Sequence, residues 1–260
     1  MNHTIGKLIR TLQSELYFMK EAKDAFYYHS RQLLRRPHDP DYRAVSFIPD
    51  SLPGCYLDVG ANQGQSIESL RLYKPRARIY SYEANSSLAK KLMNRYAHHN
   101  DITILPYGLT DRKQERILFT PVYKGFVYDG IASFDKDSAA NWLNANTLYW
   151  FSPESLELRE TPCSTERLDD QALDPIFIKI DVQGYEYQVV EGGIETIRRC
   201  EPVLMIEDLY PSLVHLLHEL GYEQYLFDET GFYRCDSLQV INTLLMTTDR
   251  AGTVTRSAKG

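Results

Sequence analysis

The segment FIKIDVQGYEYQVVEGG, residues 177–193, decides which fold class this chain of 260 residues adopts. Its first part is an apolar, β-branched run typical of a buried strand, and the run ends on Asp181. Gly184 follows, and a second acid, Glu186, opens a helix-like pattern. A buried strand that turns through a glycine into a helix is the repeating unit of an α/β fold. The charge at the end of that strand needs an explanation.

Strand-like and helix-like patterns alternate from residue 54 onward. This alternation favours βαβ units, and hence a doubly wound, mostly parallel sheet. The strand-like runs are CYLDV (55–59), RIYSYE (78–83), ITIL (102–105), RILFT (116–120), IFIKID (176–181) and PVLMIE (202–207). Two further runs, 223–228 and 232–235, are joined by a loop short enough for a hairpin, which predicts an antiparallel end to the sheet.

The two ends of the chain lie outside this alternation. Apolar residues at helical spacing over 4–36 predict an amphipathic helix or helix pair, so residues 1–45 are predicted to form an N-terminal helical extension. We expect the extension to pack over the edge of the core, with a dimer surface or a lid as alternatives. The main domain is predicted to span 46–248, with one more helix at 237–246, and 249–260 is predicted to be a flexible tail.

An aromatic-rich insertion at about 121–165 interrupts the main domain. Its flat apolar side chains offer faces on which a sugar or polyketide ring could stack. A small satellite core beneath a long loop explains the same composition equally well. The aromatic residues concerned are Tyr123, Phe126, Tyr128, Phe134, Trp142, Tyr149, Trp150 and Phe151.

Composition and charge exclude several classes of protein. The formal charge of -6 comes without a basic block, so we expect no nucleic-acid partner. No run of about 20 apolar residues predicts a membrane span. Residues 1–20 lack the apolar stretch of a signal peptide, so we expect a cytoplasmic location. The four cysteines lack metal-ligand spacing and the helical pair His215 and His218 has no evident third ligand, so no metal is predicted.

The glycine turn LDVGANQGQS, residues 57–66, carries the first sign of a ligand. It leaves a buried strand at Asp58, passes Gly60 and Gly64, and opens a helix whose first N–H groups are unpaired. The next predicted strand ends on Glu83, about 20 residues later, where an acid can accept hydrogen bonds from two ribose hydroxyls. A structural strand-to-helix turn explains either half alone, but the two halves together favour a nucleoside ligand.

The carboxylate of Asp58, which precedes the turn, distinguishes between two kinds of ligand. A dinucleotide site would carry GxGxxG and leave room for a pyrophosphate, whereas this turn has the sequence DVGANQG. A carboxylate at Asp58 would repel a pyrophosphate but suits a ligand that bears a cationic amino or sulfonium group. S-adenosylmethionine is such a ligand, and NAD is not. A nicotinamide-dependent oxidoreductase and a non-catalytic scaffold with a cofactor fold are the alternatives.

These motifs resemble those of the class I S-adenosylmethionine-dependent methyltransferases, and more narrowly the FkbM-type family. The resemblance covers about residues 54–208 and rests on DVGANQGQS, YEAN, GIASF, STERLDD, and FIKIDVQGYEYQVVEGG followed by PVLMIE. The family usually has an acid, a glycine and a glutamate after the strand aspartate, and Gln183 stands here in place of that acid. The resemblance implies a seven-stranded, Rossmann-like sheet whose last strand is antiparallel, with S-adenosylmethionine as cofactor. The candidate cofactor-binding residues are Asp58, Gly60, Asn62, Gly64, Ser66, Glu83, Ala84 and Asn85.

The resemblance also implies that the strand ending at Asp181 lies beside the strand ending at Asp58. Open α/β sheets bind ligands beyond the carboxyl ends of their strands, which gives the charge of Asp181 a use. An aliphatic hydroxyl is too weakly acidic to lose its proton before methyl transfer, so a base must take the proton as the bond forms. Asp181 is the first candidate for contacting or deprotonating the acceptor, and Glu207 is the second. A cap for the turn at Gly184 is the structural alternative for Asp181.

The sequence therefore predicts an S-adenosylmethionine-dependent methyltransferase, and an O-methyltransferase in particular. The resemblance implies a hydroxyl on a glycan or a secondary metabolite as the acceptor. Self-association through the N-terminal helices is a further expectation.

Overall fold

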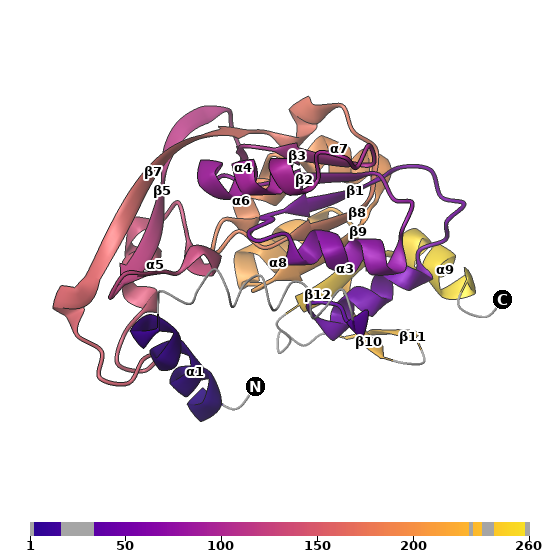
Figure 1. Cartoon of the computed structure of the whole chain (residues 1–260). Helices are drawn as coiled ribbons and strands as arrows, with labels where there is room; N and C mark the ends of the chain where they lie inside the picture. Colours follow the sequence, from indigo (N-terminus) through magenta and orange to yellow (C-terminus); the bar gives the residue numbers. More distant parts are fainter. Residues whose placement is uncertain (1–2, 17–33, 229–230, 236–241, 258–260) are drawn as a thin grey trace. The chain divides into compact units, whose positions relative to one another are not determined.

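The computed structural model of the chain describes residues 3–16, 34–228, 231–235 and 242–257. Two compact units are present, and each is treated by itself below. The larger unit comprises residues 35–114 and 164–260, and the smaller comprises residues 1–34 and 115–163. Figure 1 labels the helices and strands of both units.

The larger unit contains an eight-stranded sheet with the strand order β11-β10-β12-β9-β8-β1-β2-β3 (Figure 1). The strands from β9 to β3 are parallel to one another, whereas β12, β10 and β11 run antiparallel to their neighbours. The bounds are β1 Cys55–Val59, β2 Ile79–Tyr82, β3 Ile102–Leu105, β8 Pro175–Ile180, β9 Val203–Glu207, β10 Tyr222–Asp228, β11 Gly231–Arg234 and β12 Asn242–Thr247. The prediction of a mostly parallel sheet with an antiparallel end is confirmed, with one strand more than the seven expected.

Helices cover both faces of this sheet, so it is doubly wound. On β9, Val203 and Met205 belong to one buried core and Leu204 and Ile206 to the other, because alternate side chains of a strand point to opposite faces. The first core includes side chains of η2 (Pro40–Phe47), α3 (Gln65–Tyr73), α4 (Ser86–Arg95) and α9 (Thr248–Ser257). The second includes side chains of α6 (Glu186–Glu191), α7 (Ile194–Cys200) and α8 (Pro211–Glu219). Within the ranges described, no helix is long and apolar enough to cross a bilayer.

The C-terminal part of the chain differs from the prediction. The helix expected at 237–246 is wrong for residues 242–246, which form part of strand β12 between β9 and β10. The flexible tail expected over 249–260 is also wrong for residues 249–257, because α9 buries Ala251 and Val254 in the first core, and residues 258–260 lie outside the described part of the chain. Arg250 holds the start of this helix by donating hydrogen bonds to the carbonyl oxygens of Cys200 and Glu201.

The N-terminal boundary of the larger unit also lies elsewhere than expected. Residues 40–45 were assigned by sequence to a separate extension, but they belong to η2, whose Tyr42 and Val45 are buried in the first core. The side chain of Asp39 accepts a hydrogen bond from the N–H of Asp41 and so caps η2. The packing of these apolar side chains against the sheet therefore joins 35–47 to the larger unit.

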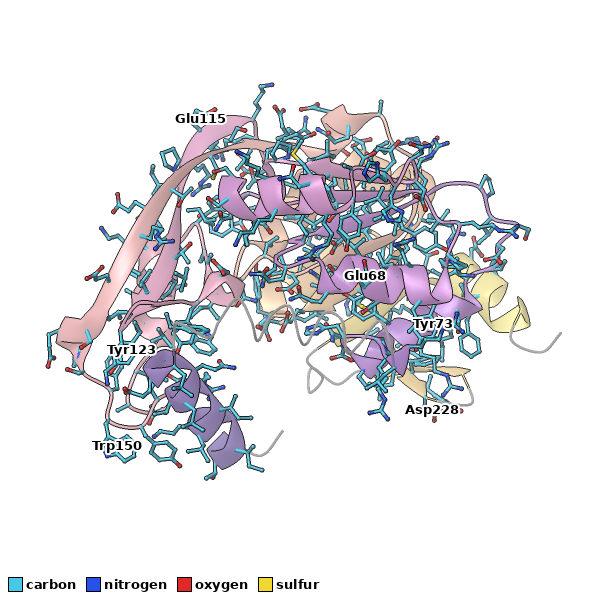
Figure 2. All side chains as sticks on the ribbon, viewed as in Figure 1. Glu68, Tyr73, Glu115, Tyr123, Trp150 and Asp228 are labelled. Atoms are coloured by element: carbon cyan, nitrogen blue, oxygen red, sulfur yellow. The ribbon has the colours of Figure 1, made fainter. Side chains whose placement is uncertain are left out.

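The smaller unit contains β6 and most of β5 and β7 from the second sheet, whose strand order is β4-β7-β5-β6; β4 and the end of β7 belong to the larger unit. A small core lies beneath this sheet, in which Tyr123, Phe126 and Tyr128 pack with Leu143 and Leu148. This is the satellite core that the aromatic composition allowed. Trp150 stays outside it, with 83% of its surface exposed (Figure 2). The bounds are β5 Gln114–Tyr123, β6 Phe126–Val127, η3 Asp129–Ile131, α5 Lys136–Trp142, η4 Pro153–Ser155 and β7 Leu156–Glu166; in the larger unit, β4 is Gly108–Leu109 and η5 is Leu168–Gln171.

The N-terminal helix α1, His3–Glu15, packs on the smaller unit through its polar side. The N–H of Tyr149 donates to Thr11 Oγ1, and Arg10 Nε donates to the carbonyl oxygen of Thr147. The apolar side chains that predicted the helix remain exposed; they are Ile5, Leu8, Ile9, Leu12 and Leu16. The rest of the predicted N-terminal helical region, 17–33, lies outside the described residues.

Candidate active site

The predicted acids lie together at the carboxyl ends of the central strands. Asp58 in β1 pairs in register with Lys179 in β8, and Asp181 follows directly after β8. Ile180 pairs with Ile206, so Asp181 and Glu207 come next on neighbouring strands. The expectation that the strand ending at Asp181 lies beside the strand ending at Asp58 is confirmed.

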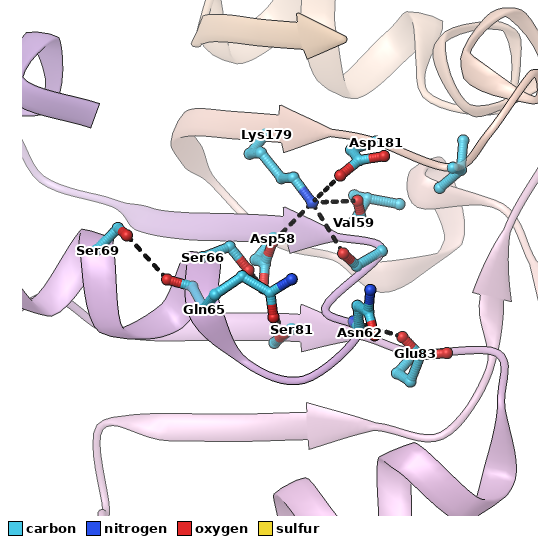
Figure 3. A network of polar contacts seen from close by, with 12 residues as sticks. Asp58, Val59, Asn62, Gln65, Ser66, Ser69, Ser81, Glu83, Lys179 and Asp181 are labelled. Carbon is cyan, nitrogen blue, oxygen red and sulfur yellow. Dashed lines mark hydrogen bonds and ion pairs between the residues drawn. The ribbon is translucent and has the colours of Figure 1, made fainter. Parts of the chain in front are cut away.

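Asp58 lies entirely inside this group, with none of its surface exposed. Its Oδ2 accepts hydrogen bonds of 2.8 Å from the hydroxyls of Ser66 and Ser81, which come from α3 and β2 (Figure 3). Its Oδ1 lies 3.5 Å from the ammonium of Lys179. Sequence analysis expected a cationic group of a ligand against this carboxylate, whereas in the structure the cation is a side chain of the protein itself.

Lys179 is a member of this polar network that sequence analysis missed. Its side chain is 8% exposed, and its ammonium donates to the Gly60 carbonyl oxygen at 2.8 Å. It also lies 3.3 Å from Oδ2 of Asp181. The signal was present, since a lysine within an otherwise apolar strand and two residues before an aspartate must share a sheet face with it.

Asp181 and Glu207 hydrogen-bond to each other and have opposite pKa shifts. Burial acts to raise the pKa of Asp181, but the Lys179 ammonium and hydrogen bonds from Glu207 and Gln183 hold it below its ordinary value. Burial, and then the charge of Asp181, raise the pKa of Glu207 to about 8. At neutral pH Asp181 is therefore ionised and Glu207 protonated. The Asp181 side chain is 29% exposed, so a ligand can reach it.

The glycine turn after β1 is shaped by the protein's own backbone. Gly60 has a φ of +87°, and a Cβ at this position would lie 1.9 Å from the Asp181 carbonyl oxygen. Asn62, with a φ of +48°, also adopts the left-handed conformation, and Gly64 precedes α3 with a φ of +85°. The first glycine is thus required by the approach of the segment after β8.

Glu83 ties the two predicted cofactor loops together. Its Oε2 accepts a hydrogen bond from the N–H of Asn62, and its Oε1 accepts one from the N–H of Asn85, both at 2.7 Å. Burial raises the pKa of Glu83 to about 7, against the lowering effect of these N–H groups. The side chain of Asn85 accepts from Ser87 and Leu88 and caps α4, and Ala84 between them is partly exposed.

The residues after Asp181 form a turn that supports it. Gln183, with a φ of +53°, donates its side-chain amide to Asp181 Oδ1 at 2.9 Å. Glu186 accepts hydrogen bonds from the N–H groups of Val182 and Gly184. Glu186 therefore caps this turn, and Asp181 remains directed to Lys179, Gln183 and Glu207.

A separate cavity of about 1020 Å³ lies at the opposite edge of the sheet. It is lined by residues at the amino ends of the strands, among them Cys55, Arg78 and Ile176. None of the candidate site residues lines it. Because the motifs meet at the carboxyl ends of the strands, the candidate active site lies at that edge of the sheet and not in this cavity.

Comparison with known proteins identifies the family of this chain. The sequence profile of the Methyltransferase FkbM domain matches residues 58–225, which is more than half of the chain. The chain belongs to the FkbM methyltransferase family. FkbM methyltransferases use S-adenosylmethionine. Among curated proteins, no sequence matches the chain.

Solved structures of methyltransferases show distant similarity. An FkbM methyltransferase from Methylobacillus flagellatus KT is 18% identical with a TM-score of 0.47, and the match covers 95% of this chain but 55% of that one. A precorrin-6y C5,15-methyltransferase from Geobacter metallireducens GS-15 is 14% identical, with a TM-score of 0.36 and coverage of 78% and 83%. An O-methyltransferase from Thermotoga maritima is 10% identical, with a TM-score of 0.35 and coverage of 80% and 64%. This chain thus spans little more than half the length of the first of these proteins.

The residues at the glycine turn fit the cofactor of the FkbM family. Each carboxylate oxygen of Glu83 keeps a second lone pair beyond its bond to the backbone. The buried Oδ1 of Asn62 and Oε1 of Gln65 accept no hydrogen bond from any described residue. Such a set of acceptors matches a ligand rich in donors, with two ribose hydroxyls and an ammonium group.

The histidine and cysteine side chains of the described residues form no candidate metal-binding site. Over the described part of the chain, no three histidine, cysteine, aspartate or glutamate side chains are grouped so that they could hold a metal ion. His215 faces Glu219 on the surface of α8, at 3.2 Å. The four cysteines are free thiols, and Cys55 and Cys163 are buried.

Proposed function

We propose that this protein is an S-adenosylmethionine-dependent O-methyltransferase acting on a hydroxyl of a glycan or a secondary metabolite. Membership of the FkbM family supports methyl transfer. The paired acids at the ends of β8 and β9 support an oxygen acceptor. The cofactor supplies a methyl group on a positively charged sulfur, which becomes a neutral thioether on transfer.

The glycine turn and the loop after β2 are suited to hold the nucleoside part of the cofactor. Glu83 already fixes both loops by accepting from Asn62 and Asn85, so its free lone pairs are held in place before a ligand arrives. Such preorganisation reduces the entropy that binding must overcome. Asp58 and Ser66 support the turn from inside the protein, since both are buried and hydrogen-bonded to each other.

Asp181 is suited to receive the proton of the acceptor hydroxyl. As the new oxygen–carbon bond forms, positive charge develops on the oxygen and its proton becomes more acidic than a carboxylic acid. A carboxylate with a lowered pKa can therefore still accept it at that stage. Glu207, protonated at neutral pH, donates its hydrogen bond to Asp181 and orients it.

The observation that carries the proposal is the partly exposed, ionised Asp181 placed within 3.3 Å of Lys179, which also holds the glycine turn. Calorimetric titration with S-adenosylmethionine, S-adenosylhomocysteine and NAD tests the cofactor. We expect micromolar binding of the first two and none of NAD. Binding of NAD alone would favour a nicotinamide-dependent oxidoreductase.

The acceptor atom is tested by transfer of a labelled methyl group. The full chain is incubated with methyl-¹³C-labelled S-adenosylmethionine and a panel of oligosaccharides and hydroxylated metabolites, and the products are examined by NMR. We expect a signal typical of a methyl ether, and its loss with Asp181→Asn, which keeps the size of the side chain. Cofactor binding with no methylated product from any acceptor would favour a non-catalytic scaffold.

We also propose that α1 is a self-association surface that pairs with α1 of a second copy. The helix turns its polar side to the smaller unit through Thr11 and Arg10, which leaves a row of apolar side chains exposed. Leu8 and Leu12, one turn apart, are each about half exposed. Two such rows can cover each other in an isologous contact.

A further inference from the structure

Lys179 stands at the centre of the polar network at the strand ends (Figure 3). Its ammonium donates to the Gly60 carbonyl oxygen at 2.8 Å and lies 3.5 Å from the Val59 carbonyl oxygen. The carboxylates of Asp58 and Asp181 lie 3.5 Å and 3.3 Å away. One group thus touches the glycine turn, the buried acid of β1 and the exposed acid after β8.

We propose that Lys179 is a positioning residue of the methyl-transfer site, which fixes the Asp181 carboxylate and the Gly60 carbonyl in one arrangement. The inference rests on the function proposed above. Through this contact the loop that holds the cofactor and the acid that meets the acceptor are set relative to each other. Alignment of donor and acceptor is a large part of what an enzyme contributes to a displacement reaction.

The stability of the fold does not by itself explain why a lysine occupies position 179. A buried ammonium must be stripped of water, and a well-packed apolar side chain commonly serves the fold as well as a buried ion pair. Neighbouring positions of β8 are filled by Phe177 and Ile178, which are fully buried. A charge at Lys179 is instead required by the two carboxylates that face it.

The ammonium keeps Asp181 able to accept a proton. Asp58 and Asp181 approach the same space from adjacent strands, and without a cation their mutual repulsion and burial would favour protonation of one of them. A protonated Asp181 could not take the proton of an acceptor hydroxyl. The raised pKa of Lys179, caused by Asp181 and Asp58 against the effect of burial, agrees with a permanent charge.

Other ionisable groups face Lys179 and Asp181 from the elements packed around them. They are Tyr42 of η2, Glu83 after β2, Glu186 of α6, Glu207 of β9 and Asp208 after β9. All but Tyr42 are acids, so Lys179 is the charge that opposes them.

The test is a titration of the Asp181 carboxyl in the full chain without any ligand. Aspartate is labelled with ¹³C at the side-chain carboxyl, and the Asp181 signal is assigned as the one missing from Asp181→Asn. In the wild type we expect titration below the ordinary range of aspartate. In Lys179→Met we expect the midpoint to rise by one pH unit or more, and in Lys179→Arg, which keeps the charge, to stay low. Lys91→Met, on the exposed side of α4, is the control and should change nothing.

A second readout is the affinity for S-adenosylhomocysteine, measured by calorimetry. Loss of the contact to Gly60 in Lys179→Met should weaken binding by about tenfold, which corresponds to about 1.4 kcal/mol, and Lys179→Arg should recover part of it. If Lys179→Met does not fold, the double variant Asp58→Asn/Lys179→Met, which also removes one of the two carboxylates that face Lys179, is measured instead.

The outcomes separate this inference from the proposed function. A wild-type Asp181 that titrates at or above the ordinary range, or a folded Lys179→Met protein in which its midpoint is unchanged, overturns the role of Lys179. Failure of the wild type to bind S-adenosylhomocysteine overturns the proposed function instead, and the titration still reports on Lys179.

Discussion

Glu207 and Asp181 end neighbouring parallel strands and share a hydrogen bond, yet they differ in charge at neutral pH. Burial and the adjacent charge raise the pKa of Glu207 to about 8, whereas Lys179 and hydrogen bonds overcome the burial of Asp181 and lower its pKa. The pair therefore holds one proton, and this proton lies on Glu207. Two acids of the same kind thus acquire different roles from their surroundings.

Glu207→Gln should make the stability of the protein less dependent on pH. A carboxyl whose pKa is raised on folding contributes stability that is complete below its unfolded value near 4.5 and is lost as the pH rises through about 8. Glutamine cannot ionise, so at high pH the variant should melt a few degrees above the wild type. Each kcal/mol of difference in the free energy of unfolding corresponds to roughly 2–4 °C in melting temperature. At pH 4.5 or below, where the wild-type carboxyl is protonated in both the folded and the unfolded state, the two should melt alike. Thermal unfolding by circular dichroism at both pH values measures this, and an equal difference at both would contradict it.

Gly60→Ala should destabilise the protein much more than Gly184→Ala, although both residues have a positive φ. A Cβ at Gly60 would lie 1.9 Å from the Asp181 carbonyl oxygen, whereas nothing lies within 4 Å of a Cβ at Gly184. Both variants meet the strain of a left-handed residue, about 1–2 kcal/mol. Gly60→Ala must also displace the segment after β8, so we expect a total of about 3 kcal/mol or more. Urea unfolding compares the two, and similar losses would count against the close approach of the two loops.

The affinity for S-adenosylhomocysteine should increase as the pH rises through about 7, because Glu83 ionises there. Ribose hydroxyls donate more strongly to a carboxylate than to a carboxylic acid. Glu83→Gln should weaken binding by about tenfold or more, since its amide would face the N–H of Asn62 or Asn85 with a donor. The variant should also lose the pH dependence. Calorimetry from pH 6 to pH 8 measures both effects, and a pH dependence that survives in Glu83→Gln would place its origin elsewhere.

The strands and the acids at their ends could be predicted from the sequence because they depend on local patterns, whereas the order of the central strands was implied only by the resemblance to the FkbM family. The glycine turn after Asp58 and the acid-ended strand at Asp181 each follow from a few adjacent residues. The contacts of Asp58 could not be predicted in the same way. Its partners Ser81 and Lys179 come from different strands, and only the sheet register brings them together.

Tertiary packing also explains the errors at the two ends of the chain. Residues 242–247 carry the apolar content of either a helix or a strand, and the gap between β9 and β10 selects the strand. Val254 lies in a polar sequence that suggests a tail, yet its side chain is fully buried. For α1, the spacing of the apolar residues predicted the helix correctly. The side of the helix that packs against the smaller unit is determined instead by hydrogen bonds of Thr11 and Arg10.

Val254→Ala should lower the free energy of unfolding by about 1–3 kcal/mol, because this valine side chain of α9 is fully buried in the first core. Asp249→Asn, on the exposed side of the same helix, is the control and should stay within about 0.5 kcal/mol of the wild type. Urea unfolding followed by tryptophan fluorescence and circular dichroism gives both values. Equal, small effects would mean that α9 behaves as the flexible tail expected from sequence.

Leu12→Glu should weaken self-association if α1 pairs with a second copy of the chain. The leucine is 51% exposed within the apolar row of α1, and a charge there would have to be desolvated in a helix-to-helix contact. Gln13→Glu adds the same charge to the next residue of the helix, outside the apolar row, and serves as the matched control. We expect the dimer dissociation constant to rise about tenfold or more for Leu12→Glu, equivalent to about 1.4 kcal/mol, and to change little for Gln13→Glu. Sedimentation velocity across a range of concentrations measures it, and a wild type that stays monomeric throughout, or two variants that respond alike, would show that the row serves another purpose.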